Sequence, residues 1–154
     1  MMISGKAYWA KVVGAPVPNK FKPDVPQWAF DLSIDEATQK ELLSKGMSKS
    51  SLKNKGDDRG TFITFTRDAV KKDGTPGKPF SIVDSKKNPW DNRLIGNGSE
   101  LNVVVSLNER TYLGKTFLKP SAVSIQVWTL VEYKSGEFQV KDDTDEQKTG
   151  TDNW

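Results

Sequence analysis

The chain has 154 residues, 35% of them hydrophobic, and a formal net charge of +3. It contains no Cys and no His, which excludes disulfides, zinc–thiolate sites and any mechanism built on a Ser-His or Cys-His pair. It has no apolar run of 18 residues, and its first residues, MMISGKAYWA, lack the apolar segment of a signal peptide. We therefore expect one cytoplasmic domain that makes no membrane contact and favours binding over catalysis.

The charge is distributed unevenly along the chain. Residues 139–154 hold two Lys and five Asp or Glu, a net charge of −3, so the remaining 21 Lys or Arg and 15 Asp or Glu give +6. A basic body with an acidic end is typical of a protein that binds polyanions and carries its own competitor. An ordinary solubilising surface would give the same counts.

The first half of the chain predicts two strands and one short helix. Residues 6–13 mix aromatic and β-branched side chains, and residues 27–34 alternate apolar and polar side chains, as half-buried strands do. Between them, residues 15–26 contain four Pro and form a loop. Ser33 or Asp35 can cap a helix over 35–45. A Ser-, Lys- and Gly-rich loop follows at 48–60.

The second half of the chain predicts four further strands, at 61–67, 80–84, 100–109 and 121–133. The segments between them are expected to be turns and loops, including a long loop at 85–99 and a hairpin loop at 110–120. About six short strands with one helix indicate a mainly β fold, and parallel βαβ architecture would need more helices. An OB-fold-like antiparallel barrel of five to six strands fits this pattern, and its surface commonly binds oligonucleotides.

The predicted hairpin loop 110–120 alternates cations with aromatic side chains. Such a pattern can hold a single strand, because cations follow the phosphates and aromatic rings stack with the bases. A solvated hairpin with Phe117 packed inward is the alternative. The residues concerned are Arg110, Tyr112, Lys115, Phe117 and Lys119.

Other aromatic residues divide between the core and the surface. Tyr8 and Trp9 are adjacent, so on a regular strand they face opposite sides, and Phe62 likewise faces away from its neighbour Ile63. Trp90 lies in a loop among cations, where it can either stack with a ligand or anchor the loop. We expect Trp28 and Trp128 to pack inside the barrel, because both lie in strongly periodic strands.

Residues 80–133 resemble the OB-fold single-stranded DNA-binding proteins of bacteriophages. The resemblance lies in VDSK at 83–86, in IGNGSELNVVVSL at 95–107, and in the basic and aromatic hairpin that leads to LVEY at 130–133. AYWAKV at 7–12 is similar to the first strand of that family. The resemblance implies dimeric or cooperative coating of single-stranded DNA during replication, recombination and repair in an infected bacterial cell.

The family's proteins end in an acidic tail with a terminal aromatic residue, which docks on replication proteins and can occupy the DNA groove. The resemblance therefore implies a DNA-binding domain at 1–138 and a partner-binding tail at 139–154, with a polymerase, helicase or primase as partner. Lys141 and Lys148 dilute the charge of this tail. The tail residues that match are Asp142, Asp143, Asp145, Glu146, Asp152 and Trp154.

Single-stranded DNA binding is thus the leading hypothesis, with no cofactor and no metal, and DNA and RNA are not distinguished. The candidate contacts are Tyr8, Trp9, Lys11, Phe62, Arg67, Trp90, Arg93, Arg110, Tyr112 and Lys115. One alternative is a metal-dependent nuclease or resolvase that uses carboxylates, although their spacing is not that of metal ligands. The carboxylates in question are Asp57, Asp58, Asp84, Asp91 and Glu100. Another alternative is an adaptor that binds only proteins.

Overall fold

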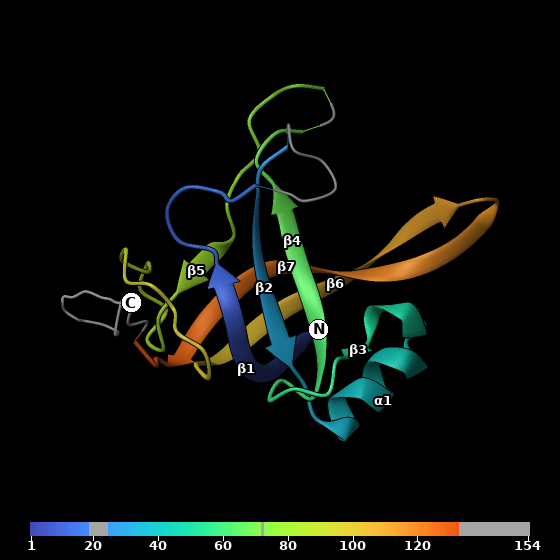
Figure 1. The fold of residues 1–154 in the computed structure, drawn as a ribbon, viewed down its shortest axis with the longest axis horizontal. Coiled ribbons are helices and arrows are strands. Elements are labelled where there is room, and N and C mark those ends of the chain that lie inside the picture. Colours follow the sequence, from blue (N-terminus) through green and yellow to red (C-terminus); the bar gives the residue numbers. More distant parts are fainter. Residues whose placement is uncertain (19–24, 72, 133–154) are drawn as a thin grey trace.

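The computed structural model describes residues 1–18, 25–71 and 73–132. Within these ranges, seven strands form one strongly curved sheet in the order β3-β4-β2-β1-β6-β7-β5 (Figure 1). The strands are β1 (Met2–Lys11), β2 (Gln27–Ser33), β3 (Lys53–Asn54), β4 (Thr61–Asp68), β5 (Ser81–Val83), β6 (Glu100–Tyr112) and β7 (Lys115–Thr129). Neighbouring strands are antiparallel except β5 and β7, which are parallel. The structure therefore confirms the expected mainly β, OB-fold-like architecture.

The curved sheet brings β4 back toward β7. The two strands close the barrel without a ladder of backbone hydrogen bonds between them. Arg67 bridges this seam, because its Nη2 donates to the carbonyl oxygen of Ala122 at 3.3 Å. The same guanidinium lies over the ring of Phe80, 5.4 Å from its centroid. Arg67 is thus a structural cation at the seam. Its predicted role as a phosphate contact stays a prediction, since one of its N–H groups is directed at the protein's own backbone and the side chain is only partly buried.

The core is filled by the inward faces of the strands. On β2 the inward positions are Trp28, Phe30 and Leu32, and the ring of Phe30 stacks on that of Phe65 with centroids 5.2 Å apart. The ring of Phe80 packs edge-on against the ring of Phe30. Trp28 packs in the core as predicted. Tyr8, Trp9, Phe62 and Trp128 do not belong to this core.

A β-bulge in β1 changes the expected direction of its aromatic residues. The pairing of β1 with β2 shifts register between Tyr8 and Lys11, and Trp9 has a φ of 52°, in the left-handed region. Neither Tyr8 nor Trp9 belongs to the core, where Ala7 is the inward residue. The prediction that the two rings face opposite sides is therefore wrong, because it assumed a regular strand.

The segment 110–120, predicted as a loop, is almost entirely strand. β6 and β7 continue to Tyr112 and from Lys115, and only Leu113 and Gly114 form the turn, with φ of 51° and 78°. Two consecutive residues with positive φ match the right-handed twist of paired strands, so the ladder extends to the tip. The resulting ribbon projects well beyond the barrel (Figure 1). We call residues 108–119 the arm.

Helix α1 (Glu36–Ser44) lies close to the predicted range and supports the base of the arm. Asp35 is its N-cap, since Oδ1 accepts a hydrogen bond from the Thr38 backbone N–H at 2.8 Å. After the helix, the backbone N–H of Ser48 donates to the carbonyl of Leu118 at 3.0 Å. The predicted loop 48–60 also contains a 3₁₀ turn, Lys49–Ser51, and strand β3, which pattern analysis did not predict.

No helix in the described ranges has the length and apolar character needed to cross a bilayer.

Candidate nucleic-acid interface

The arm has two chemically different faces. Residues that lie directly opposite each other on paired strands share one face, and the register pairs Tyr112 with Lys115, Arg110 with Phe117, and Asn108 with Lys119. All the cations and aromatic rings of the predicted motif therefore lie on one face. The other face pairs Thr111 with Thr116 and Glu109 with Leu118, and carries no cation. This separation is what a ribbon that binds a polyanion on one side requires.

A basic groove continues this face onto the barrel. It is a hollow of about 220 Å³ between the base of the arm and the outer face of β3 and β4. Its cations are Lys53, Arg110 and Lys119, and no carboxylate is among its lining residues. The hydroxyl groups of Thr64 and Thr66 add hydrogen-bonding groups. Positive charge and hydroxyls without opposing acids suit a phosphate backbone.

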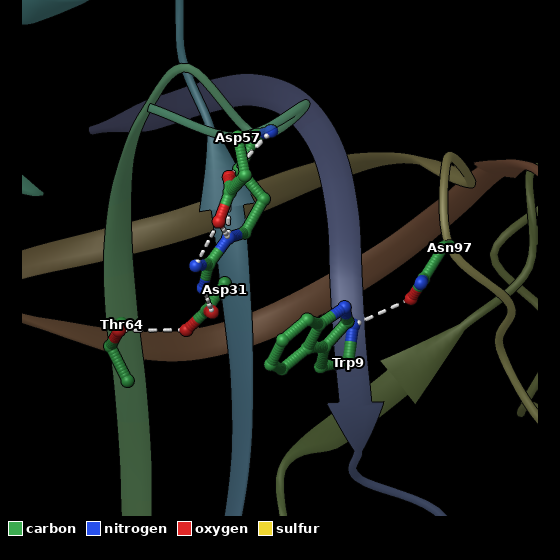
Figure 2. Close-up of polar contacts among 6 residues, drawn as sticks. Trp9, Asp31, Asp57, Thr64 and Asn97 are labelled. Atoms are coloured by element: carbon green, nitrogen blue, oxygen red, sulfur yellow. Dashed lines mark hydrogen bonds and ion pairs between the residues drawn. The ribbon is translucent and has the colours of Figure 1, made fainter. Parts of the chain in front are cut away.

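Arg59 organises the outer face of β1, β2 and β4. Its guanidinium stacks over the rings of Trp9 and Phe62, with centroid distances of 4.7 and 4.1 Å. Nη1 donates to Asp31 Oδ2 at 2.7 Å, and Nε donates to Asp57 Oδ1 at 3.0 Å (Figure 2). Trp9 remains 62% exposed while Phe62 is 1% exposed. Arg59 thus covers the ring of Phe62, and the predicted contact of Phe62 with DNA stays a prediction that would require Arg59 to move.

The Arg59 ion pairs have a clear electrostatic effect. The hydrogen bond from the Arg59 side chain is the main cause that lowers the pKa of Asp57 to about 2. The same hydrogen bond raises the pKa of Arg59 above its ordinary value. Both groups stay charged at neutral pH. Because two carboxylates contact this one guanidinium, it has little net charge to offer a phosphate.

A second, larger hollow lies beside Tyr8 on the outer face. It measures about 660 Å³, and Tyr8 and Trp128 are among its lining residues. Its charged lining residues are the three carboxylates Asp35, Asp58 and Glu100 and one cation, Lys6. Trp128 is 56% exposed, so its predicted place inside the barrel is wrong. Its neighbour Val127 takes the inward position, and alternation directs Trp128 outward. We call this the acidic hollow, and its charge makes it a poor site for phosphates.

The loop 85–99 uses Trp90 as an anchor. The ring is half-buried against the core, and its Nε1 donates to the carbonyl of Arg93 at 3.0 Å. Arg93 lies over the ring, 4.6 Å from its centroid, and forms an ion pair with Asp91 at 2.9 Å. Trp90 and Arg93, both predicted to contact DNA, therefore have partners within their own loop. Their place at the DNA interface stays a prediction.

The remaining predicted contacts are on the surface. Lys11 is exposed at the end of β1, and Arg110, Tyr112 and Lys115 are exposed on the arm, where Tyr112 reaches 68%. The structure thus groups Arg110, Tyr112 and Lys115 on one face. The six predicted tail residues lie outside the described residues; they are Asp142, Asp143, Asp145, Glu146, Asp152 and Trp154.

Two cations that the fold brings to the outer surface, Lys53 and Arg59, were not among the residues predicted from the sequence, and Trp128 was expected inside the barrel. Alternation beside Val127 could have placed Trp128 outside. No local signal could have found Arg59, because its partner Asp31 lies 28 residues away in the chain.

No family model and no curated protein matches this chain. Among solved structures, it is similar to gp2.5, a single-stranded DNA-binding protein encoded by bacteriophage T7, with a TM-score of 0.61 and 17% identity over 89% of this chain and 95% of that one. It is also similar to the single-stranded DNA-binding protein from bacteriophage Enc34, with a TM-score of 0.56 and 10% identity over 93% of this chain and 88% of that one. The Enc34 protein in complex with single-stranded DNA gives a TM-score of 0.57 at 10% identity, over 84% of this chain and 85% of that one.

The molecule is thus an OB-type β barrel that carries a long β-ribbon. Its fold is that of bacteriophage single-stranded DNA-binding proteins, and the resemblance of residues 80–133 is confirmed for the fold.

Proposed function

We propose that this chain binds single-stranded DNA without sequence preference. The observation that carries the proposal is the register of the arm, which gathers Arg110, Lys115 and Lys119 with two aromatic rings on one face. The basic groove extends this face to Lys53 on the barrel. Neutralising phosphates releases counterions, so affinity falls steeply as the salt concentration rises.

Aromatic stacking supplies the preference for single strands. A single strand leaves its bases free, whereas a duplex hides them inside its own stack. The exposed rings of Trp9 and Tyr112 meet this need on the barrel and on the arm respectively. The polar groups of the basic groove are cations and hydroxyls, which can contact the phosphates of any sequence.

The biological setting that we propose is DNA replication, recombination and repair in phage-infected bacterial cytoplasm, with no enzymatic activity of its own. Residues 1–138 form the DNA-binding domain, and residues 139–154, with a net charge of −3, form a segment that recruits replication proteins. Carboxylates can mimic phosphates, so this segment also competes for the basic groove. The similarity of the fold to phage proteins that bind single-stranded DNA supports the setting.

Three of the five carboxylates considered for a nuclease have other partners. Asp57 and Asp91 each bind an arginine, and Asp84 accepts hydrogen bonds from the backbone N–H groups of Lys86 and Asn88. Among the described residues, no group of three or more acidic side chains could hold a metal ion. Incubation of single-stranded and duplex DNA with the protein and Mg²⁺ or Mn²⁺ tests this alternative, and we expect no cleavage.

The proposal is tested by titrating the Trp fluorescence of the full-length protein with oligo-dT and with duplex DNA of equal length. We expect quenching by oligo-dT that weakens with salt, and a much weaker response to the duplex. A parallel titration of residues 1–138 should show tighter binding if the acidic segment competes for the groove. The absence of binding to either DNA, checked by gel shift, would favour an adaptor that binds only proteins.

A further inference from the structure

Trp9 has an unusual backbone that the structure holds in place from a neighbouring loop. A φ of 52° is uncommon for any residue other than Gly and costs more for a bulky one. The Trp9 backbone N–H donates to Asn97 Oδ1 at 2.7 Å, as Figure 2 shows. The turn that carries Asn97 is itself tied to β1, because the N–H of Gly98 donates to the carbonyl of Ala7 at 2.8 Å. The direction of the Trp9 side chain is therefore fixed at its backbone.

The ring of Trp9 is fixed independently through Arg59. The guanidinium covers one face of the indole, and Arg59 is itself only 7% exposed. Its position is set by Asp31 and Asp57, and Asp31 is held in turn by a hydrogen bond from Thr64 Oγ1 at 2.7 Å (Figure 2). A planar guanidinium that stacks and is held by two carboxylates is a support that Lys cannot reproduce.

This arrangement has no evident use in packing the core. Trp9 lies outside the core and is 62% exposed, so the bulge directs a large apolar ring toward solvent. One indole face rests on Arg59, which leaves the opposite face for a ligand. Since the charge of Arg59 is matched by carboxylates, the ligand that fits the free face is a flat, neutral ring, such as a nucleobase.

We propose that Trp9 is a base-stacking platform and that Arg59 and Asn97 are its positioning residues. This inference rests on the proposed binding of single-stranded DNA. Arg59 acts through the indole rather than by contact with a phosphate, and Asn97 acts through the backbone of Trp9. The barrel therefore offers one stacking position whose geometry exists before DNA arrives, so that little ordering is needed when a base binds.

Two oligonucleotides of equal length separate this role from phosphate binding: oligo-dT, and an abasic strand with the same phosphates and no bases. Trp9→Ala should weaken oligo-dT binding about 5- to 20-fold, the lower part of the range expected for losing one stacked base, and leave abasic binding unchanged. Arg59→Lys should weaken oligo-dT binding about 3- to 10-fold, again without effect on the abasic strand. The double variant should bind no more weakly than Trp9→Ala alone, because both changes remove the same interaction.

Asn97 provides a second test that leaves the ion pairs intact. Asn97→Ala should lower the ratio of oligo-dT to abasic affinity, and Asn97→Asp, which keeps the acceptor oxygen, should restore that ratio. Circular dichroism and the thermal midpoint establish that each variant is folded. If Arg59→Lys is not folded, the comparison of Asn97→Ala with Asn97→Asp tests the platform by itself. Lys53→Gln, in the basic groove, is the matched control and should weaken both oligonucleotides by the same factor.

The outcomes are distinct. Equal weakening of both strands by Arg59→Lys, or additive losses in the double variant, would overturn the positioning role. A wild-type protein that binds both strands equally would overturn the platform while it preserves the proposed phosphate binding. A wild-type protein that binds neither strand would overturn the proposed function itself.

Discussion

The arm and the Trp9 platform both present aromatic rings, but they are built in opposite ways. The arm assembles its cations and rings from twelve consecutive residues, and a strand register is sufficient to bring them to one face. The platform needs Trp9, Asp31, Arg59 and Asn97, which come from four separate segments. The arm therefore offers charge on an extended ribbon, whereas the platform offers one ring in a fixed place. The first suits attraction of the phosphate chain and the second suits recognition of a base.

The largest effect should come from removing charge at the base of the arm. The double variant Arg110→Ala/Lys119→Ala should weaken oligo-dT binding roughly 10- to 100-fold at low salt, because two phosphate contacts are lost. The slope of log affinity against log salt should fall by about 1.4. Fluorescence titration across a salt series measures both. Thr111→Ala/Thr116→Ala, on the opposite face of the same arm, is the control, and an equal loss there would show that both faces bind.

The next effect concerns the aromatic part of the arm. Tyr112→Ala should weaken oligo-dT binding about 5- to 10-fold, because a stacked base loses its partner, while the salt slope stays unchanged. The ring is 68% exposed, so the thermal midpoint should not move. Unchanged affinity would restrict base stacking to the barrel and sharpen the division between the two regions.

A smaller effect on binding, and a larger one on stability, is expected at Asp31. Asp31→Asn keeps an acceptor for Thr64 but removes a charge from the partly buried Arg59, so the thermal midpoint should fall. The resulting loosening of Arg59 should reduce the preference for oligo-dT over the abasic strand. Asp58→Asn, in the loop that carries Arg59 but without a described ion pair, is the control. An unchanged midpoint would mean that Asp57 alone holds Arg59.

The smallest effect is a dependence on acid. The pKa of Asp57 is lowered from 3.8 to about 2 in the folded protein, so its contribution to stability is complete above pH 3.8. That contribution should be lost as the pH falls through about 2. The change in the unfolding midpoint between pH 4 and pH 2 should therefore be smaller in Asp57→Asn than in the wild type. An identical change in both proteins would contradict the assigned ion pair.

The same contrast explains what could be predicted from the sequence. Strand periodicity over 27–34 and 100–109 and the helix at 35–45 were predicted closely, because hydrophobic spacing and caps are local signals. The cations and rings of the arm follow from the same local pattern, although the sequence predicts a loop where the structure has a two-stranded ribbon. The direction of Trp9 was not predictable, since it depends on a bulge and on the distant Asn97. The contacts of Phe62 with Arg59 and of Arg67 with Ala122 were not predictable either, because both are set by tertiary structure.

The contact between Ser48 and Leu118 divides the β6–β7 ribbon into two lengths with different mechanics. On the barrel side, β6 has β1 as a third strand and β7 has β5, whereas beyond Leu118 the two strands have only each other. A two-stranded ribbon in water has little stability of its own. Amide hydrogen exchange should therefore be fast from 109 to 117 and slow from 121 to 127. The part of the ribbon beyond Leu118 should therefore move more independently of the barrel than the part before it.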